Sequence, residues 1–148
     1  MKNWFLVVIW MGFIFFLSHQ PDLKSGLSGN LDFIFRKTAH FLEYAVLTWL
    51  FFRAFRGTNL GSFDLGASLL KAFRRAFRSE APKSKDPKST FKSALILAIF
   101  FSILYSFSDE WHQSFVFGRD SSLGDVGVDS FGVISAAWLI KRKMVRWR

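Results

Sequence analysis

Four apolar segments alternate with polar stretches along this 148-residue chain, and they constrain the possible folds more than any other feature. The segments run roughly over 3–17, 36–55, 91–110 and 125–140. Each uninterrupted apolar run is shorter than the ~20 residues that cross a typical hydrocarbon core, so the polar ends of the segments must enter the headgroup region. We therefore predict an all-α, polytopic integral membrane protein, with a single domain over 1–148 that forms a four-helix transmembrane bundle.

The composition supports a membrane protein and excludes several other classes. Hydrophobic residues make up 51% of the chain, with 20 Phe and 6 Trp, which is too apolar for a soluble protein of this length. The absence of cysteine excludes disulfides, thiol catalysis and a thiolate metal site. The net charge of +9 is concentrated in two blocks that flank apolar segments, so we predict membrane lipids and no nucleic acid as partners.

The positive residues also predict the orientation in the membrane. The connection from Arg53 to Lys92, with the basic loop 56–90 at its centre, contains ten Lys and Arg against three acids. The tail after the fourth segment adds five more cations. Because cytoplasmic loops are enriched in Lys and Arg, we predict a multi-pass protein of the cytoplasmic membrane with both termini in the cytoplasm. The connections over 18–35 and 116–124 are then outside.

The first apolar segment also permits a second interpretation. Lys2 followed by a short apolar run is compatible with a cleaved signal peptide. However, the following Ser18-His19-Gln20-Pro21 contains no small-x-small cleavage site. We therefore expect the segment to be retained as an uncleaved helix.

The basic loop has a helical period of its own between Ser62 and Ser79. One face carries Leu70, Phe73 and Phe77, and the other carries Lys71, Arg74, Arg75 and Arg78. This pattern predicts an in-plane amphipathic cytoplasmic helix that is attracted to anionic lipid. The alternative is a disordered basic linker that only enforces topology. The stretch 81–90, rich in Lys, Pro and Ser, predicts a flexible linker in either case.

Charged and polar side chains gather where the second, third and fourth segments reach the predicted outer surface. Charges beside hydrocarbon are costly unless they pair, face a cavity or take part in chemistry. The predicted orientation brings all of these groups to one membrane surface, so we predict that they form one site. The residues are Arg36, Lys37, His40, Glu43, Tyr44, Asp109, Glu110, His112, Gln113, Arg119, Asp125 and Asp129.

Several motifs built from these residues resemble a known family. They are Ser18-His19-Gln20-Pro21, Arg36-Lys37-x-x-His40-Phe41-x-Glu43-Tyr44, Ser108-Asp109-Glu110-x-x-Gln113, and Gly118-Arg119 followed by Asp125 and Gly132. Together they closely resemble the VanZ-like membrane proteins over nearly the whole chain outside the basic loop. The resemblance implies a small helical membrane protein of the cell envelope, linked through the family's name to glycopeptide (teicoplanin) resistance, and it implies no established reaction.

The chain departs from the family pattern at three places. Asp129 stands where the family usually has Asn, which adds a charge, and Ala136 replaces a second Gly. The basic loop over 57–90 is longer than the usual connection. The electrostatics of the site can therefore differ from those of the family.

Two interpretations of the predicted site need no catalysis. In the first, Arg36, Lys37 and Arg119 pair with carboxylates and hold the helix ends together, at about 0.5–2 kcal/mol per contact. In the second, the same cations bind a phosphate, pyrophosphate or carboxylate of an anionic lipid-linked envelope precursor, with Arg preferred for bidentate contact. The other residues of that binding site would be Tyr44, Glu110, Gln113, Asp125 and Asp129.

A third interpretation is a membrane-embedded hydrolase or transferase that acts on a lipid phosphate or an amide. His40, with Glu43 or Asp109 to orient its imidazole, would be the general base. A metal is conceivable, because His40-x-x-Glu43 and Asp109-x-x-His112 each place two ligands on one helical face. That spacing is generic and the interleaved cations oppose metal binding, so we predict no metal and no cofactor.

Overall fold

The computed structural model describes residues 2–20, 29–57, 87–118 and 122–146, and each of these segments is dominated by one α-helix. The helices are α1 (Lys2–Ser18), α2 (Gly29–Gly57), α4 (Pro87–Gln113) and α5 (Leu123–Arg146). No β-strand occurs within the described residues, so the predicted all-α class is confirmed for them. The predicted in-plane helix over 62–79 lies outside the described residues.

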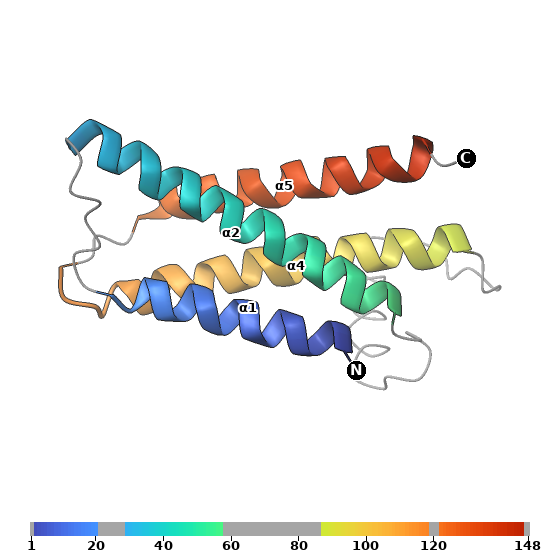
Figure 1. The fold of residues 1–148 in the computed structure, drawn as a ribbon, viewed down its shortest axis with the longest axis horizontal. Helices are drawn as coiled ribbons and strands as arrows, with labels where there is room; N and C mark the ends of the chain where they lie inside the picture. The colour runs from blue at the N-terminus through green and yellow to red at the C-terminus, as the bar shows by residue number, and fades with distance from the viewer. Residues whose placement is uncertain (1, 21–28, 58–86, 119–121, 147–148) are drawn as a thin grey trace.

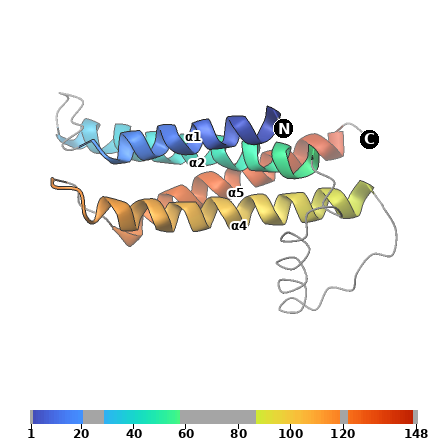
Figure 2. The ribbon, with the colours of Figure 1, turned by 90° about the horizontal axis from the view of Figure 1, so that it is seen from below.

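Successive helices run in opposite directions along one common axis (Figure 1). In the view from below, α1 lies beside α2, and α5 starts beside α4 and crosses toward the level of α2 (Figure 2). α2 packs against each of the other three helices, whereas α1 packs against α2 and α4 but not against α5. The ends of α1 and α4 therefore meet the starts of α2 and α5 at one end of the bundle, while both termini lie at the other end.

Local sequence signals explain where two of the helices begin. α2 starts at Gly29 rather than at the predicted Arg36, because Asp32 places a carboxylate in the first turn and forms an i,i+4 ion pair with Arg36. α5 starts after Ser122, whose hydroxyl accepts the Gly124 N–H at 3.0 Å and so caps the helix.

α4 begins earlier than the sequence predicted. Pro87 is its first residue. The first N–H groups of a helix have no acceptor within the helix, so proline, which lacks an N–H, loses no hydrogen bond there. The structure thus places 87–90 in the helix, although the sequence predicted a flexible linker over 81–90, and the rest of that stretch lies outside the described residues. α4 also extends to Gln113, beyond the predicted end at Glu110.

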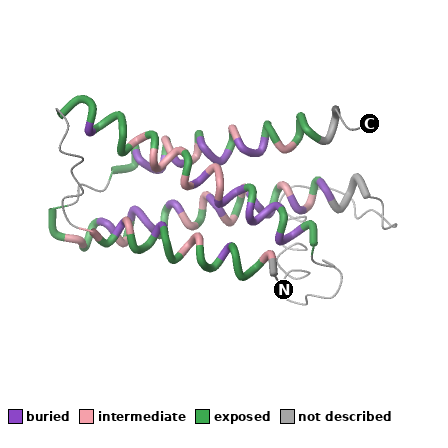
Figure 3. The backbone as a smooth tube through the Cα atoms, viewed as in Figure 1, coloured by how far each residue is buried: buried purple, intermediate pink, exposed green. Residues whose placement is uncertain are grey.

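Two segments, Phe91–Gln113 and Leu123–Lys143, are long and apolar enough to cross a membrane, and Asn3–Ser18 is a shorter apolar helix. Exposed residues line the outward faces of the helices (Figure 3), and many of them are large and apolar, such as Phe5 and Phe35 at 67% and 62% exposure. Soluble monomers rarely expose apolar surface so extensively, so the outer faces of these helices suit lipid better than water.

The helices α2 and α5 approach each other closely at one glycine. A Cβ atom added at Gly132 would overlap the backbone carbonyl oxygen of Phe41, so only a residue without a side chain fits there. His40 precedes Phe41 in α2, and Asp129 lies about one turn before Gly132 in α5. The close approach therefore brings His40 and Asp129 within reach of each other.

Candidate functional site

The structure brings most of the predicted site residues together at the end of the bundle where α1 and α4 end. We call this the polar end; its buried polar residues are Ser18, Asp32, Ser106, Asp109, Glu110, Gln113, Asp125 and Asp129. Buried polar groups are stable only when they are paired or hydrogen-bonded. Arg119 lies outside the described residues.

Asp109 is the centre of a hydrogen-bonded group that joins α1 to α4. Its Oδ2 accepts the Ser18 hydroxyl at 2.8 Å and the Gln113 side-chain amide at 2.9 Å. The same amide nitrogen of Gln113 lies 3.2 Å from the Ser18 hydroxyl, so the three side chains form a closed triangle. Oδ1 of Asp109 is buried and has no hydrogen-bond partner in the described part of the chain.

Asp129 is fully buried and holds His40. Its Oδ1 lies 3.3 Å from Nδ1 of His40, and its Oδ2 accepts the Ser106 hydroxyl at 2.6 Å. The sequence predicted Glu43 or Asp109 as the carboxylate partner of His40, but the hydrogen bond goes to Asp129. The reason is the close approach of α2 and α5 at Gly132, which no spacing within one helix reveals.

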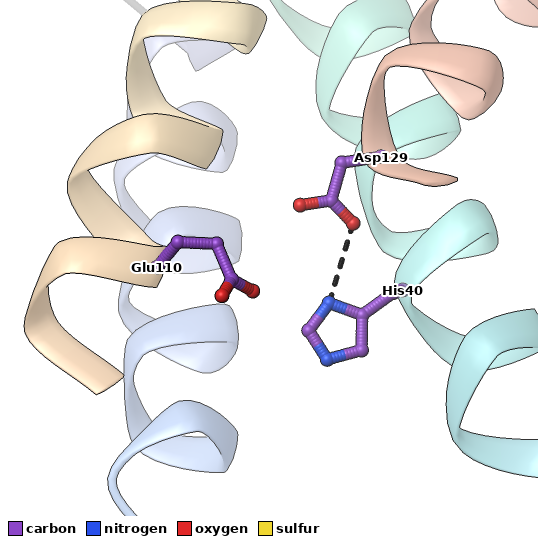
Figure 4. Close-up of side chains that lie close together, drawn as sticks. All are labelled: His40, Glu110 and Asp129. Atoms are coloured by element: carbon purple, nitrogen blue, oxygen red, sulfur yellow. Dashed lines mark hydrogen bonds and ion pairs between the residues drawn. The ribbon is translucent and has the colours of Figure 1, made fainter. Parts of the chain in front are cut away.

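Glu110 approaches the same place from α4. Its Oε2 accepts the backbone N–H of Ser122 at 3.0 Å, whereas its Oε1 is buried and has no hydrogen-bond partner among the described residues. Figure 4 shows the Glu110 carboxylate pointing toward the imidazole of His40 and the carboxylate of Asp129. One ligand atom from each of these three residues lies within 4.8 Å of the other two.

The two described cations of the site are already engaged. Lys37 forms an ion pair with Asp125 of α5, and its Nζ also lies 5.1 Å from the centre of the Phe33 ring. Nε of Arg36 lies 3.1 Å from Asp32 within α2, and its side chain remains 49% exposed. Of the predicted anion-binding cations, Arg36 and Lys37 are thus present at the polar end, and in this arrangement each of the two contacts a carboxylate.

Tyr44 and Glu43 lie deeper along α2. Tyr44 is fully buried, and its hydroxyl has no hydrogen-bond partner among the residues that the structure describes. The backbone carbonyl of Glu43 accepts the indole N–H of Trp10 at 3.0 Å, which ties α1 to α2. The neighbouring Tyr105 hydroxyl donates to the Met11 carbonyl at 2.7 Å, so of these two tyrosines only Tyr44 has an unpaired hydroxyl.

His112 separates from the buried group. It is partly exposed, and its Nε2 lies 3.3 Å from Nδ1 of His19 in an exposed pair of imidazoles that also contacts Phe15. Asp109 and His112 were candidate metal ligands because they share one helical face. Asp109 is buried, whereas His112 lies at the surface, so the two do not form one site. The pair His19 and His112 sits at the surface of the polar end.

The polar end has more acids than bases, and it has unpaired acceptors. Five buried carboxylates, from Asp32, Asp109, Glu110, Asp125 and Asp129, face the arginine Arg36, the lysine Lys37 and the histidine His40. Three buried oxygen atoms lack a partner in the described residues, and leaving such a group unpaired costs ~1–3 kcal/mol each. This arrangement is chemically suited to accept a hydrogen-bond donor or a cation between the helices.

The polar end lies within a region of the chain that matches a known protein family. The chain matches the sequence profile of the family described as VanZ/LLP1 over residues 3–146, which is essentially its whole length. The chain belongs to the VanZ/LLP1 family. The matched range contains every residue of the polar end, so the resemblance inferred from the motifs is confirmed. No curated protein and no solved structure matches the chain.

In this VanZ/LLP1 protein the structure adds three serines to the site that the sequence did not predict. Ser106 hydrogen-bonds Asp129, Ser122 contacts Glu110 through its backbone, and Ser18 hydrogen-bonds Asp109. Ser106 could have been found, because it shares a helical face with Asp109 and Glu110 at i+3 and i+4. The backbone contact of Ser122 depends on tertiary structure and leaves no signal in the sequence.

Proposed function

We propose that this VanZ/LLP1 protein crosses the cytoplasmic membrane four times, as one domain, with both termini in the cytoplasm and the polar end outside. The antiparallel order of the four helices and the cations of the basic loop support this orientation. At the opposite end of the bundle, the guanidinium groups of Arg53 and Arg142 lie 4.7 Å and 4.1 Å from the ring centres of Trp49 and Trp138. Such Arg–Trp pairs are typical of membrane interfaces.

The polar end, in this proposal, recognises the headgroup of a lipid-linked or peptidoglycan-related envelope precursor. The observation that carries the proposal is the set of buried, unpaired oxygens on Tyr44, Asp109 and Glu110. Hydroxyl and amide groups of a sugar or peptide would donate hydrogen bonds to these oxygens. The half-exposed Arg36 is placed to meet an anionic part of the same ligand.

The alternative to headgroup recognition is that the charged residues only hold the helices together. The pair Lys37–Asp125 fits that alternative well, since it joins α2 to α5, whereas Arg36 and Asp32 both lie in α2 and join no two helices. The same alternative leaves the excess carboxylates and the three unpaired oxygens unexplained, because a structural network is stable when every member is satisfied. Headgroup recognition accounts for the unpaired oxygens, because hydroxyl and amide groups of the ligand would donate hydrogen bonds to them.

The test of this proposal is a binding measurement on the full chain in lipid nanodiscs. The probe is a polyprenyl pyrophosphate that carries a sugar and peptide, and phosphatidylglycerol serves as an anionic lipid without them. We expect the probe to bind in preference to phosphatidylglycerol, and Asp109→Asn to weaken its binding. Equal binding of both lipids would contradict headgroup recognition. A matched change in teicoplanin susceptibility of cells that express the same variants would connect this binding to glycopeptide resistance.

A second candidate function is hydrolysis or transfer at a lipid phosphate or amide. The specific observation is that Asp129 fixes the His40 imidazole through Nδ1, while Ser106 holds the other oxygen of Asp129. A carboxylate in this position orients an imidazole and keeps it basic, as general-base catalysis requires. Release of phosphate or amine from the bound probe by the wild type, and its loss in His40→Gln, would establish this activity.

A further inference from the structure

The three side chains at the centre of the polar end are of the types that hold divalent cations. His40 of α2, Glu110 of α4 and Asp129 of α5 offer one imidazole nitrogen and two carboxylate oxygens (Figure 4). Each comes from a different helix, and the three ligand atoms lie within 4.8 Å of one another. Mixed imidazole and carboxylate sets suit transition-metal ions such as Zn²⁺ and Mn²⁺.

The distance between His40 and Asp129 fits two ligands of one ion. Nδ1 of His40 and Oδ1 of Asp129 are 3.3 Å apart, which is long for a hydrogen bond to a carboxylate. Two ligand atoms of a tetrahedral ion with bonds of ~2.0–2.1 Å lie about 3.3–3.4 Å apart. These two atoms therefore already have the spacing of neighbouring metal ligands.

The third ligand brings an independent observation. Oε1 of Glu110 is buried, has no hydrogen-bond partner among the described residues, and belongs to a carboxylate that points toward the other two ligands. We infer that His40, Glu110 and Asp129 bind one divalent cation of the Zn²⁺ or Mn²⁺ class.

The surroundings of the three ligands support a bound cation. Ser106 donates to Asp129 and the backbone N–H of Ser122 donates to Glu110, so both carboxylates are held from behind, as is usual for metal ligands. The two described cations of the site, which argued against metal binding, form ion pairs with other carboxylates. Lys37 pairs with Asp125 and Arg36 with Asp32, and neither forms an ion pair with the three ligands within the described residues.

A bound cation would also remove a conflict in the proposed headgroup recognition. Only this part of the inference rests on the proposed function. An anionic headgroup would meet the buried carboxylates of the polar end, which repel it. A divalent cation with three protein ligands keeps at least one coordination position open. A phosphate oxygen of the headgroup can occupy that position and so bind where the protein's own side chains are mostly acidic.

The inference is tested by metal binding to the full chain in nanodiscs without any added precursor. After chelator treatment and removal of the chelator, Zn²⁺ and Mn²⁺ are titrated by calorimetry, and bound metal is counted by elemental analysis. We expect one ion per chain, with affinity at least about 100-fold lower in Glu110→Gln and Asp129→Asn. His112→Gln is the matched control, because it removes an exposed imidazole two residues from Glu110 that pairs with His19.

Three results would overturn the inference. They are no stoichiometric binding by the wild type, unchanged affinity in Glu110→Gln, or loss of the ion in His112→Gln, which would assign it to the surface histidine pair. Helicity and elution volume show whether each variant folds. If Glu110→Gln does not fold, Co²⁺ is bound to the wild type instead and its absorption spectrum is recorded. A spectrum that shows no imidazole and carboxylate ligands would exclude the site. Precursor binding that persists in metal-free protein would refute the role of the cation in headgroup binding, while leaving headgroup recognition intact.

Discussion

Replacing Tyr44 by phenylalanine separates a ligand-binding site from a purely structural network. Tyr44 is fully buried, and its hydroxyl is unpaired among the described residues. A buried hydroxyl without a partner costs ~1–3 kcal/mol, and Tyr44→Phe deletes it with almost no change of volume. We therefore expect the ligand-free variant to unfold with a free energy about 1 kcal/mol higher than the wild type, which for a chain of this length raises the melting midpoint by roughly 2–4 °C.

The same change should weaken function. If the hydroxyl contacts a bound headgroup, Tyr44→Phe loses that hydrogen bond, and binding of the sugar–peptide pyrophosphate should fall by roughly 3- to 10-fold. A more stable protein that binds less well is the expected combination. It is measured by thermal unfolding in detergent and by binding in nanodiscs on the same preparations.

Tyr105→Phe is the matched control for this experiment. The Tyr105 hydroxyl donates to the Met11 carbonyl at 2.7 Å, so its removal should lower the free energy of unfolding by about 0.5–1.5 kcal/mol. A destabilised Tyr44→Phe variant would show that the Tyr44 hydroxyl has a partner in the folded protein. Unchanged binding by a stabilised variant would remove Tyr44 from the site.

Three further outcomes follow from the fold. A reporter that is active only outside the cytoplasm should be silent when fused at Lys83, and strong activity there would reverse the proposed orientation. Gly132→Ala should destabilise the protein by about 1–3 kcal/mol, because its Cβ meets the Phe41 carbonyl. Gly127→Ala, which has nothing within 4 Å of an added Cβ, should not destabilise it, and equal effects of the two would contradict the close approach of α2 and α5. Ser122→Ala should cost about 1 kcal/mol in thermal unfolding through loss of the α5 cap, whereas an unchanged midpoint would rule out that cap.

Much of the fold could be predicted because hydropathy and helical period are local properties. The all-α class follows from apolar runs that are too long for strands. The helix starts were less predictable: Asp32 and Arg36 extend α2 through an ion pair that lies outside the apolar run. Composition predicts a linker at Pro87, whereas proline is well tolerated in the first turn of a helix and begins α4 here.

The sequence predicted that several polar residues lie at one end of the bundle, but it did not predict their pairings. Loop charge and helical faces were enough to expect His40, Asp109 and Asp129 at one end of the bundle. Which carboxylate meets His40 depends on how closely α2 and α5 pack, and Gly132 decides that through contact with another helix. Interhelical distances of this kind depend on tertiary packing, so they cannot be predicted from residue spacing in a single sequence.

The separation of charge along the bundle has an electrical consequence. Acidic side chains are concentrated at the polar end, whereas Arg53, Arg56, Lys141 and Arg142 lie toward the opposite end. In the proposed orientation the protein is a dipole whose positive end faces the negative side of an energised membrane. Moving one elementary charge across 100 mV changes the free energy by about 2.3 kcal/mol, so the membrane potential itself opposes inversion of the molecule.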